Sequence, residues 1–227
     1  MSLGIGDIIK PVQDALTPVG NTLSDAWQIV LGDRIAAWRL TNAAKIQVKV
    51  NEQVQALGLK LNTAKIPERY ALAWFEEATK QDEDEIQTLF AKLLAKAAAG
   101  DEDALDRRHI SVLAQFTPID AKAFSILGDA NFSPTDDAAL VTRSLLGIRW
   151  DAVKLERALV AEHGEQYAAS LEHLTNIGIL DKEYEVMPGR PRPSRSLSGS
   201  SNPTISYETQ RRYRLTRLGA SLSIAVK

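Results

Sequence analysis

The sequence contains no cysteine and only three histidines among its 227 residues. Without cysteine, neither a disulfide framework nor a thiolate metal site can form, and this composition fits a reducing cytosol. No run of about 18 or more apolar residues is present, so we expect no transmembrane helix. The first residues also lack the cationic start and apolar core of a secretory signal peptide. We therefore expect a cytoplasmic protein.

Motifs of catalysis are equally scarce. The phosphate-binding loop, the nucleophile elbow and the zinc-protease helix are all missing. His163 and His173 are ten positions apart, which is not the spacing of two metal ligands on one helix face. The acidic runs at 82–85 and 101–103 are explained by the preference for carboxylates at helix starts, and the lone His109 is interpreted as structural or solvated. We predict a protein that is not an enzyme, with no catalytic residue, metal or cofactor.

The clearest pattern in the chain runs from Ile66 to Gly100. Pro67 suits the first turn of a helix, the acidic run at 82–85 starts a second helix, and Gly100 is expected to end it in a left-handed conformation. The apolar positions of both helices recur at helical spacing, which predicts a helical hairpin with a buried seam. These positions are Tyr70, Ala71, Trp74, Phe75 and Ala78 in the first helix, and Ile86, Leu89, Phe90, Leu93, Leu94 and Ala97 in the second.

This stretch resembles the signature region of the abortive infection alpha family. The matching features are an Ile-Pro opening, an aromatic helix, an acidic run, a Leu-Leu helix, a short Leu-rich helix and a capped helix. In this chain they are Ile66-Pro67, Ala73-Trp74-Phe75, Asp82 to Glu85, Leu93-Leu94-Ala95, Ile110 to Leu113 and Thr117 to Leu127. The resemblance implies phage defence of the abortive infection type. It also implies action through helical contact with a second copy, in a homo-oligomer, or with another bacterial or phage protein.

The N-terminal residues 1–65 are predicted to form amphipathic helices. Residues 4–20 place apolar side chains at near-helical intervals, which fits either helix packing or attachment to a membrane surface. Membrane-surface helices usually carry several basic residues, whereas Lys10 stands nearly alone here, so packing or oligomer contact is favoured. Trp27 and Trp38 are expected to pack in the core rather than to form a ligand platform.

The last third of the chain is basic, in contrast to an acidic middle. Residues 67–187 hold 12 Lys and Arg against 23 Asp and Glu, whereas residues 188–227 hold 8 against 1. A predicted helix at 166–176 is followed by two alternating stretches, 182–186 and 205–215, and by a helix capped by Thr216. This order is typical of a winged helix-turn-helix module.

A winged helix suggests a second function, contact with nucleic acid. The expected recognition helix at 166–176 has no Lys or Arg, so sequence-specific readout of bases is disfavoured. The hairpin, by contrast, carries arginines that form a candidate phosphate-binding patch. They are Arg190, Arg192, Arg195, Arg211, Arg212 and Arg214. The alternative is a solvated basic loop that keeps an acidic protein in solution.

We predict a mainly α-helical protein in three segments. Residues 1–65 form the amphipathic helices and residues 66–128 the helical core with the family signature. Residues 129–227 form a winged-helix-like module with a small β-hairpin, whose flexible basic wing spans 187–204. Non-enzymatic phage defence is the favoured function. A nucleic-acid-binding regulator that uses the basic wing, and a membrane-surface effector that uses residues 4–20, are the alternatives.

Overall fold

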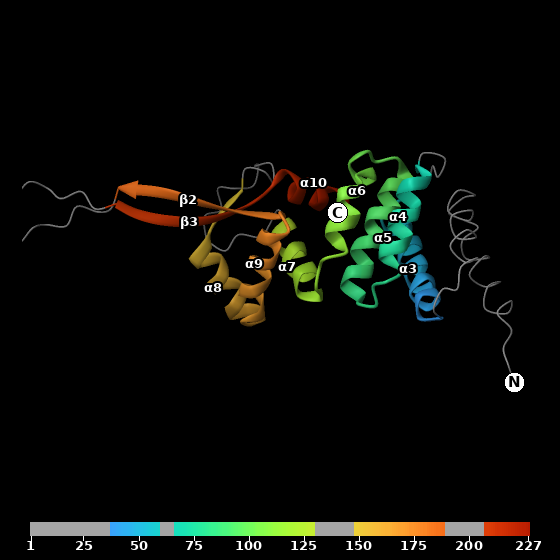
Figure 1. Cartoon of the computed structure of the whole chain (residues 1–227), viewed down its shortest axis with the longest axis horizontal. Coiled ribbons are helices and arrows are strands. Elements are labelled where there is room, and N and C mark those ends of the chain that lie inside the picture. The colour runs from blue at the N-terminus through green and yellow to red at the C-terminus, as the bar shows by residue number, and fades with distance from the viewer. Residues whose placement is uncertain (1–36, 60–65, 130–147, 189–206) are drawn as a thin grey trace, which may run out of the picture. The chain divides into compact units, whose positions relative to one another are not determined.

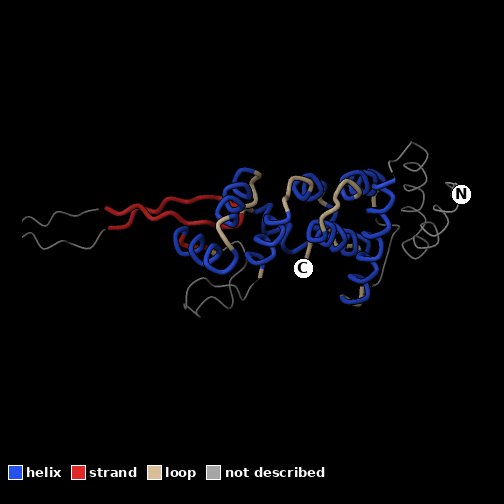
Figure 2. Tube along the Cα trace, turned by 90° about the horizontal axis from the view of Figure 1, so that it is seen from below, coloured by secondary structure: helices blue, strands red, loops and turns tan. Residues whose placement is uncertain are grey.

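The computed structural model describes residues 37–59, 66–129, 148–188 and 207–227 (Figure 1). The chain divides into two compact units, which we call the helical unit (residues 1–126 and 221–227) and the sheet unit (residues 127–220). The described residues are mainly helical, with one small antiparallel sheet of three strands (Figure 2). The mainly α-helical class with a small β-hairpin is therefore confirmed. The division into three segments remains a prediction.

The helical unit is built around α4 and α5, the two helices of the signature hairpin. All of the apolar positions that the helical spacing selected in this hairpin are buried. Trp74 donates a hydrogen bond from its indole nitrogen to the carbonyl oxygen of Phe90 at 3.0 Å, so this buried polar group is satisfied. Gly100 ends α5 at φ 90°, in the expected left-handed conformation. Pro67 lies one position earlier than expected, because it is the N-cap of α4 rather than its first helical residue. The helices are α3 (Ala37–Ala56), α4 (Glu68–Ala78), α5 (Asp84–Ala99), the 3-10 turn η3 (Asp103–Leu105), α6 (Arg107–Leu113) and α7 (Pro118–Gly128).

The interpretation of Trp38 as a core residue is wrong. Its side chain on α3 is 51% exposed, whereas Ile46 and Val50 on the same helix are buried. At 3.6 residues per turn, Trp38 lies about 80° around the helix from Ile46, at the edge of the buried stripe. Spacing alone placed it in that stripe, but the ring extends to the outside. Trp27 lies outside the described residues.

The sheet unit contains a short strand, two helices and a long hairpin. The strands are β1 (Arg149–Asp151), β2 (Leu180–Pro188) and β3 (Tyr207–Leu215), all antiparallel in the order β1-β3-β2. The helices are α8 (Ala152–His163), α9 (Gln166–Asn176) and the start of α10 (Arg217–Ala225). The predicted helix at 166–176 and the strand at 182–186 are confirmed, and the strand is longer than expected. The second stretch, 205–215, is a strand from residue 207 on.

Thr216 fixes the start of α10 against the beginning of the hairpin. Its hydroxyl donates to the carbonyl oxygen of Gly178 at 2.6 Å and accepts from the backbone N–H of Gly219 at 3.0 Å. A Cβ at Gly219 would lie 2.3 Å from the carbonyl oxygen of Ile179. Only glycine permits this close approach, so the pattern Leu-Thr-x-x-Gly in this part of the chain has a packing cause.

Two tryptophans in the described part of the helical unit, Trp74 and Trp38, provide a test of its core. We expect Trp74→Ala to lower the free energy of unfolding by about 3–5 kcal/mol, because a fully buried indole leaves a cavity. Trp38→Ala, the control, should lower it by clearly less than Trp74→Ala does, because about half of the Trp38 side chain is exposed and its removal leaves no enclosed cavity. Chemical denaturation measures both values. Equal losses from the two variants would contradict the placement of Trp38 on the outside.

Candidate functional site

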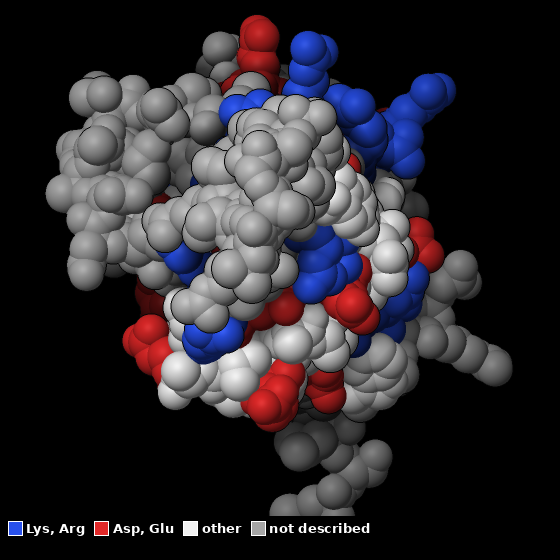
Figure 3. All heavy atoms as spheres, turned by 90° about the vertical axis from the view of Figure 1, so that its left-hand side faces the viewer, with Lys and Arg blue, Asp and Glu red and all other residues white. Residues whose placement is uncertain are grey.

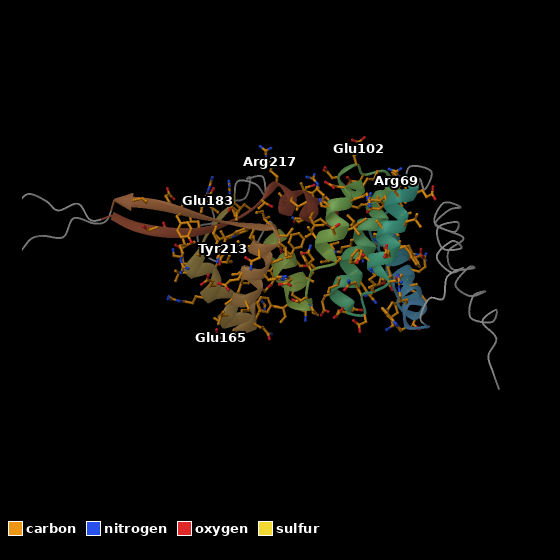
Figure 4. All side chains as sticks on the ribbon, viewed as in Figure 1. Arg69, Glu102, Glu165, Glu183, Tyr213 and Arg217 are labelled. Carbon is orange, nitrogen blue, oxygen red and sulfur yellow. The ribbon has the colours of Figure 1, made fainter. Side chains whose placement is uncertain are left out.

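Alternation along β2 and β3 gives the hairpin two chemically different faces. Residues directly opposite each other in an antiparallel pair point to the same side of the sheet. Glu183 lies opposite Arg212, and Tyr184 lies opposite Arg211. One face, the ion-pair face, therefore carries Asp181, Glu183, Glu185, Gln210, Arg212 and Arg214, and the other, the tyrosine face, carries Lys182, Tyr184, Val186, Thr209, Arg211 and Tyr213. Figure 4 shows Glu183 on one side of the hairpin and Tyr213 on the other, towards α8 and α9.

The ion-pair face is a ladder of alternating charges. Arg214 contacts Asp181 at 2.8 Å and Glu183 at 3.0 Å, and Arg212 contacts Glu185 at 2.8 Å. Arg149 on β1 extends the ladder by contacting Glu183 at 2.9 Å. The hydrogen bond to Asp181 raises the pKa of Arg214. A connected network of this kind holds its charges in fixed positions better than isolated surface pairs do.

A pocket of about 460 Å³ opens on the hairpin, lined by Arg149, Glu183, Tyr184, Glu185 and Arg212. Its two arginines form ion pairs with its two carboxylates, Arg149 with Glu183 and Arg212 with Glu185, so the positive and negative charges of the lining cancel. Beside it, Gln210 donates a hydrogen bond to Asp151, the N-cap of α8. This arrangement ties β1, α8 and β3 together.

The tyrosine face is covered near its base and open further along. Tyr213 is 1% exposed, and its hydroxyl donates to Glu156 of α8 at 3.0 Å. Burial and this carboxylate raise its pKa. Lys182 lies 3.8 Å from Glu172 of α9 and 5.4 Å from the ring of Tyr213. Beyond the helices, Tyr184 and Val186 are 64% and 62% exposed.

The structure separates the arginines that the sequence grouped together. Arg190, Arg192 and Arg195 lie outside the described residues. Arg212 and Arg214 lie on the ion-pair face, where Arg214 contacts Asp181 directly opposite it and Arg212 contacts Glu185, diagonally across the strand pair. Arg211 is exposed on the tyrosine face. Phosphate binding by this set of arginines therefore remains a prediction, and its members are not equivalent.

The exposed surface of α9 and its N-cap carries two carboxylates and no Lys or Arg. Glu165, Gln166 and Glu172 are exposed, and Glu165 stands at the start of the helix (Figure 4). In Figure 3, basic side chains lie next to acidic ones in several places. A helix without Lys or Arg offers no cation to the phosphates on either side of a DNA groove. This observation agrees with the sequence argument against base readout by α9.

The carboxylates of the helical unit have structural partners. Asp84 and Glu85 begin α5 and contact Lys49 at 2.7 Å and Lys122 at 2.9 Å. The hydrogen bond from Lys122 lowers the pKa of Glu85. Asp106 caps α6 by accepting from the backbone N–H of Arg108 at 2.9 Å. Among the described residues, no group of three or more His, Cys, Asp or Glu is arranged to hold a metal ion.

His109 is fully buried on α6. Among the described contacts, neither ring nitrogen has a hydrogen-bond partner. Burial lowers its pKa, and the nearby carboxylate of Asp106 opposes this effect only in part. A neutral imidazole is therefore part of the packed core, beside η3 and the 2.8 Å hydrogen bond from Tyr70 to the carbonyl oxygen of Ala104.

The exposed pair of Tyr184 and Val186 was not among the residues predicted from the sequence. A signal was present in the segment from Asp181 to Val186, in which acidic residues occupy the odd positions only. Alternation of this kind assigns all of the acids to one face.

The chain is thus a mainly helical protein with a small sheet. On one face of its hairpin the charged side chains form ion pairs, and the other face is partly exposed. A family model described as abortive infection alpha matches residues 41–226, and the chain belongs to this family. Membership indicates abortive-infection defence against phage. Comparisons with curated proteins and with solved structures find no match.

The membrane alternative depended on residues 4–20, which lie outside the described residues. In the part of the chain that the structure describes, no helix combines the length and the hydropathy needed to cross a membrane.

His109 makes the stability of the protein depend on pH. Its folded-state pKa lies below the unfolded value of about 6.5. The stability from the buried neutral imidazole is therefore complete above this unfolded value and is lost as the pH falls from there towards the folded pKa. We expect stability to decrease below about pH 6.5 by at most about 1.4 kcal/mol per pH unit from this group. Denaturation of the wild type and of His109→Met across this range measures the contribution.

His109→Met should remove this part of the decrease, because methionine fills the site without a titrating group. His163→Gln, which changes a half-exposed histidine, is the control and should keep the wild-type profile. A wild-type profile in His109→Met would show that the buried imidazole does not titrate on unfolding.

Proposed function

We propose that this protein defends bacteria against phage by abortive infection, without catalysis, through contact with a protein partner in the cytoplasm. The partner is a second copy of the chain or another bacterial or phage protein. The observation that carries this proposal is the outer surface of α3 in the helical unit, where large apolar side chains lie exposed. We call the residues Trp38, Thr41, Ala44, Lys45, Val48, Glu52 and Gln55 the outer α3 surface.

The outer α3 surface has the composition of a protein contact. Trp38 and Val48 are 51% and 57% exposed, and Leu57, just beyond the helix, is 39% exposed. Single exposed apolar residues are normal, but here an exposed tryptophan and valine share one helix side with only two charged residues, Lys45 and Glu52. Tryptophan is among the residues that most often dominate binding energy at interfaces. The family match begins at residue 41, so it includes Val48 and most of α3 but not Trp38.

The absence of catalysis is supported by what the polar side chains do. Asp120 accepts hydrogen bonds from the backbone N–H and the hydroxyl of Thr117, both at 2.8 Å, and so closes the start of α7. Asp151 caps α8 by accepting a hydrogen bond from the backbone N–H of Lys154. Burial tends to raise the pKa of Asp151, but the hydrogen bonds from Lys154 and Gln210 outweigh this effect, and the pKa is lowered. These carboxylates hold helix starts in place, which is a structural role.

We propose, further, that the sheet unit is a winged-helix module. The order β1, α8, α9, β2, β3 supports this, since the second helix of such a module is followed directly by the hairpin that forms the wing. The acidic surface of α9 argues against its use as a reader of duplex sequence. The module would then serve as a scaffold for the hairpin.

Phage challenge tests the defence and the contact surface together. Cells that carry the gene should show fewer plaques than cells without it, across a panel of phages. Val48→Asp should restore plaque counts towards those of cells without the gene, because a buried carboxylate is costly at an apolar interface. Plaque counts that do not differ with and without the gene would contradict the defence role.

Val153→Asp is the matched control. Val153 is also an exposed valine on a helix, at 48%, but it lies on α8 in the sheet unit. This variant should protect like the wild type, and both variants should unfold at wild-type denaturant concentrations. Loss of protection in both would show that the outer α3 surface has no special role.

A further inference from the structure

The open part of the tyrosine face has a chemical character that the defence role does not explain. Past the ends of α8 and α9, the hairpin continues as two strands on their own (Figures 1 and 2). On this stretch Tyr184 and Val186 of β2 lie beside Arg211 and Thr209 of β3, and all four side chains are exposed. A tyrosine left 64% exposed gives up much of the stabilisation that burial of its ring would provide.

Charge is divided unequally between the two faces of the hairpin. Between 180 and 186 on β2 and between 209 and 215 on β3, all carboxylates point to the ion-pair face. On the tyrosine face the hairpin contributes only cations, Lys182 and Arg211. Lys182 is engaged near the base by Glu172. Among the described residues no ion pair joins Arg211 to a carboxylate, in contrast to the adjacent Arg212 and to Arg214.

We propose that Tyr184 and Arg211 form a binding site for single-stranded nucleic acid, with a base stacked on the tyrosine ring and a backbone phosphate held by the guanidinium. The two residues are direct partners across the strand pair, so their side chains start from neighbouring positions on one face. An exposed aromatic beside a cation is the arrangement by which proteins bind single strands without reading sequence. Val186 extends the apolar part of the platform along the strand.

A single strand fits this face better than a duplex does. The faces of bases in a duplex are already stacked on one another, so the ring of Tyr184 could not stack on them without opening the helix. The acidic surface of α9, with Glu165 and Glu172, also disfavours a groove that would bring two phosphate backbones close. The sequence continues the positive character past β2, because residues 189–206 contain Arg190, Arg192 and Arg195 and no acidic residue.

The test is direct binding of the full-length protein to labelled oligonucleotides. Fluorescence anisotropy with an oligothymidylate, an oligouridylate and a mixed-sequence duplex of the same length compares the possible ligands at low salt. We expect both single strands to bind more tightly than the duplex, with an affinity that falls as salt is added. A preference between the two single strands decides whether RNA or DNA is the better ligand, and either result supports the site.

The test variants change Tyr184 and Arg211 on the tyrosine face, and the control variant changes the adjacent Arg212 on the ion-pair face. Tyr184→Ala should weaken single-strand binding about 5- to 150-fold, and Tyr184→Phe should retain it, because the ring is the stacking element. Arg211→Ala should weaken binding and reduce the slope of log affinity against log salt by about 0.7. Arg212→Ala removes the same charge from the ion-pair face and should leave the affinity within about twofold, because this guanidinium is paired with Glu185.

Several outcomes would overturn the proposal. These are an absence of binding to every oligonucleotide at low salt, tighter binding of the duplex with no effect of Tyr184→Ala, and equal losses from Arg211→Ala and Arg212→Ala. A change of oligomeric state in Tyr184→Ala, measured by light scattering, without a change in oligonucleotide affinity would assign the face to a protein contact instead. All of these measurements use purified protein, so they are independent of the phage challenge of the outer α3 surface.

Discussion

The pairing of β2 with β3 fixes which residue lies opposite which along the whole hairpin. Because side chains alternate between the two sides of a sheet, a shift of one residue would exchange the faces. In the observed register, Arg214 and Arg212 lie on the same side as Asp181, Glu183 and Glu185, and they close a ladder of ion pairs. A slipped register would bury the acids near the base against α8 and α9 and expose Tyr213. The slipped register is unfavourable because the ring of Tyr213 would lose its burial against the helices.

The register is held at the end of the hairpin that lies against the helices. Tyr213 and Leu215 are buried there, Trp150 of β1 lies opposite Tyr213, and Thr216 ties the end of β3 to Gly178. These contacts are apolar or are made with the backbone, so they do not depend on salt. The ion-pair ladder needs this fixed base, since pairs between exposed side chains contribute little unless their geometry is already set. The buried contacts at the base therefore fix the register, and the register in turn positions the ion pairs and the exposed side chains further along the hairpin.

Periodicity predicted the helical hairpin of the helical unit because each of its helices buries one broad side. Every selected apolar position of α4 and α5 is buried, and Gly100 adopts the expected conformation. The same reasoning was wrong for Trp38, which lies at the edge of the stripe on α3, where the neighbouring helices decide whether a side chain is covered. For the candidate site, the sequence identified the basic hairpin but not the separation of Arg211 from Arg212. That separation depends on register and on where the covering helices end, and neither is a local property of the sequence.

The two exposed apolar surfaces therefore arise from different physical causes. On α3, Trp38 and Val48 are exposed because the buried stripe of a helix covers only part of its circumference. On the hairpin, Tyr184 is exposed because β2 continues past α9, so that no helix among the described residues covers this side of the sheet further along. In the first case Thr41 and Ala44 are small and neutral, and the charged neighbours Lys45 and Glu52 have opposite signs, which suits a protein surface. In the second case the neighbour is Arg211, and a cation beside an aromatic ring suits a ligand that has both a negative charge and a flat apolar face. One chain thus has two surfaces that differ in the chemistry of what they can bind, and a change at one need not alter the other.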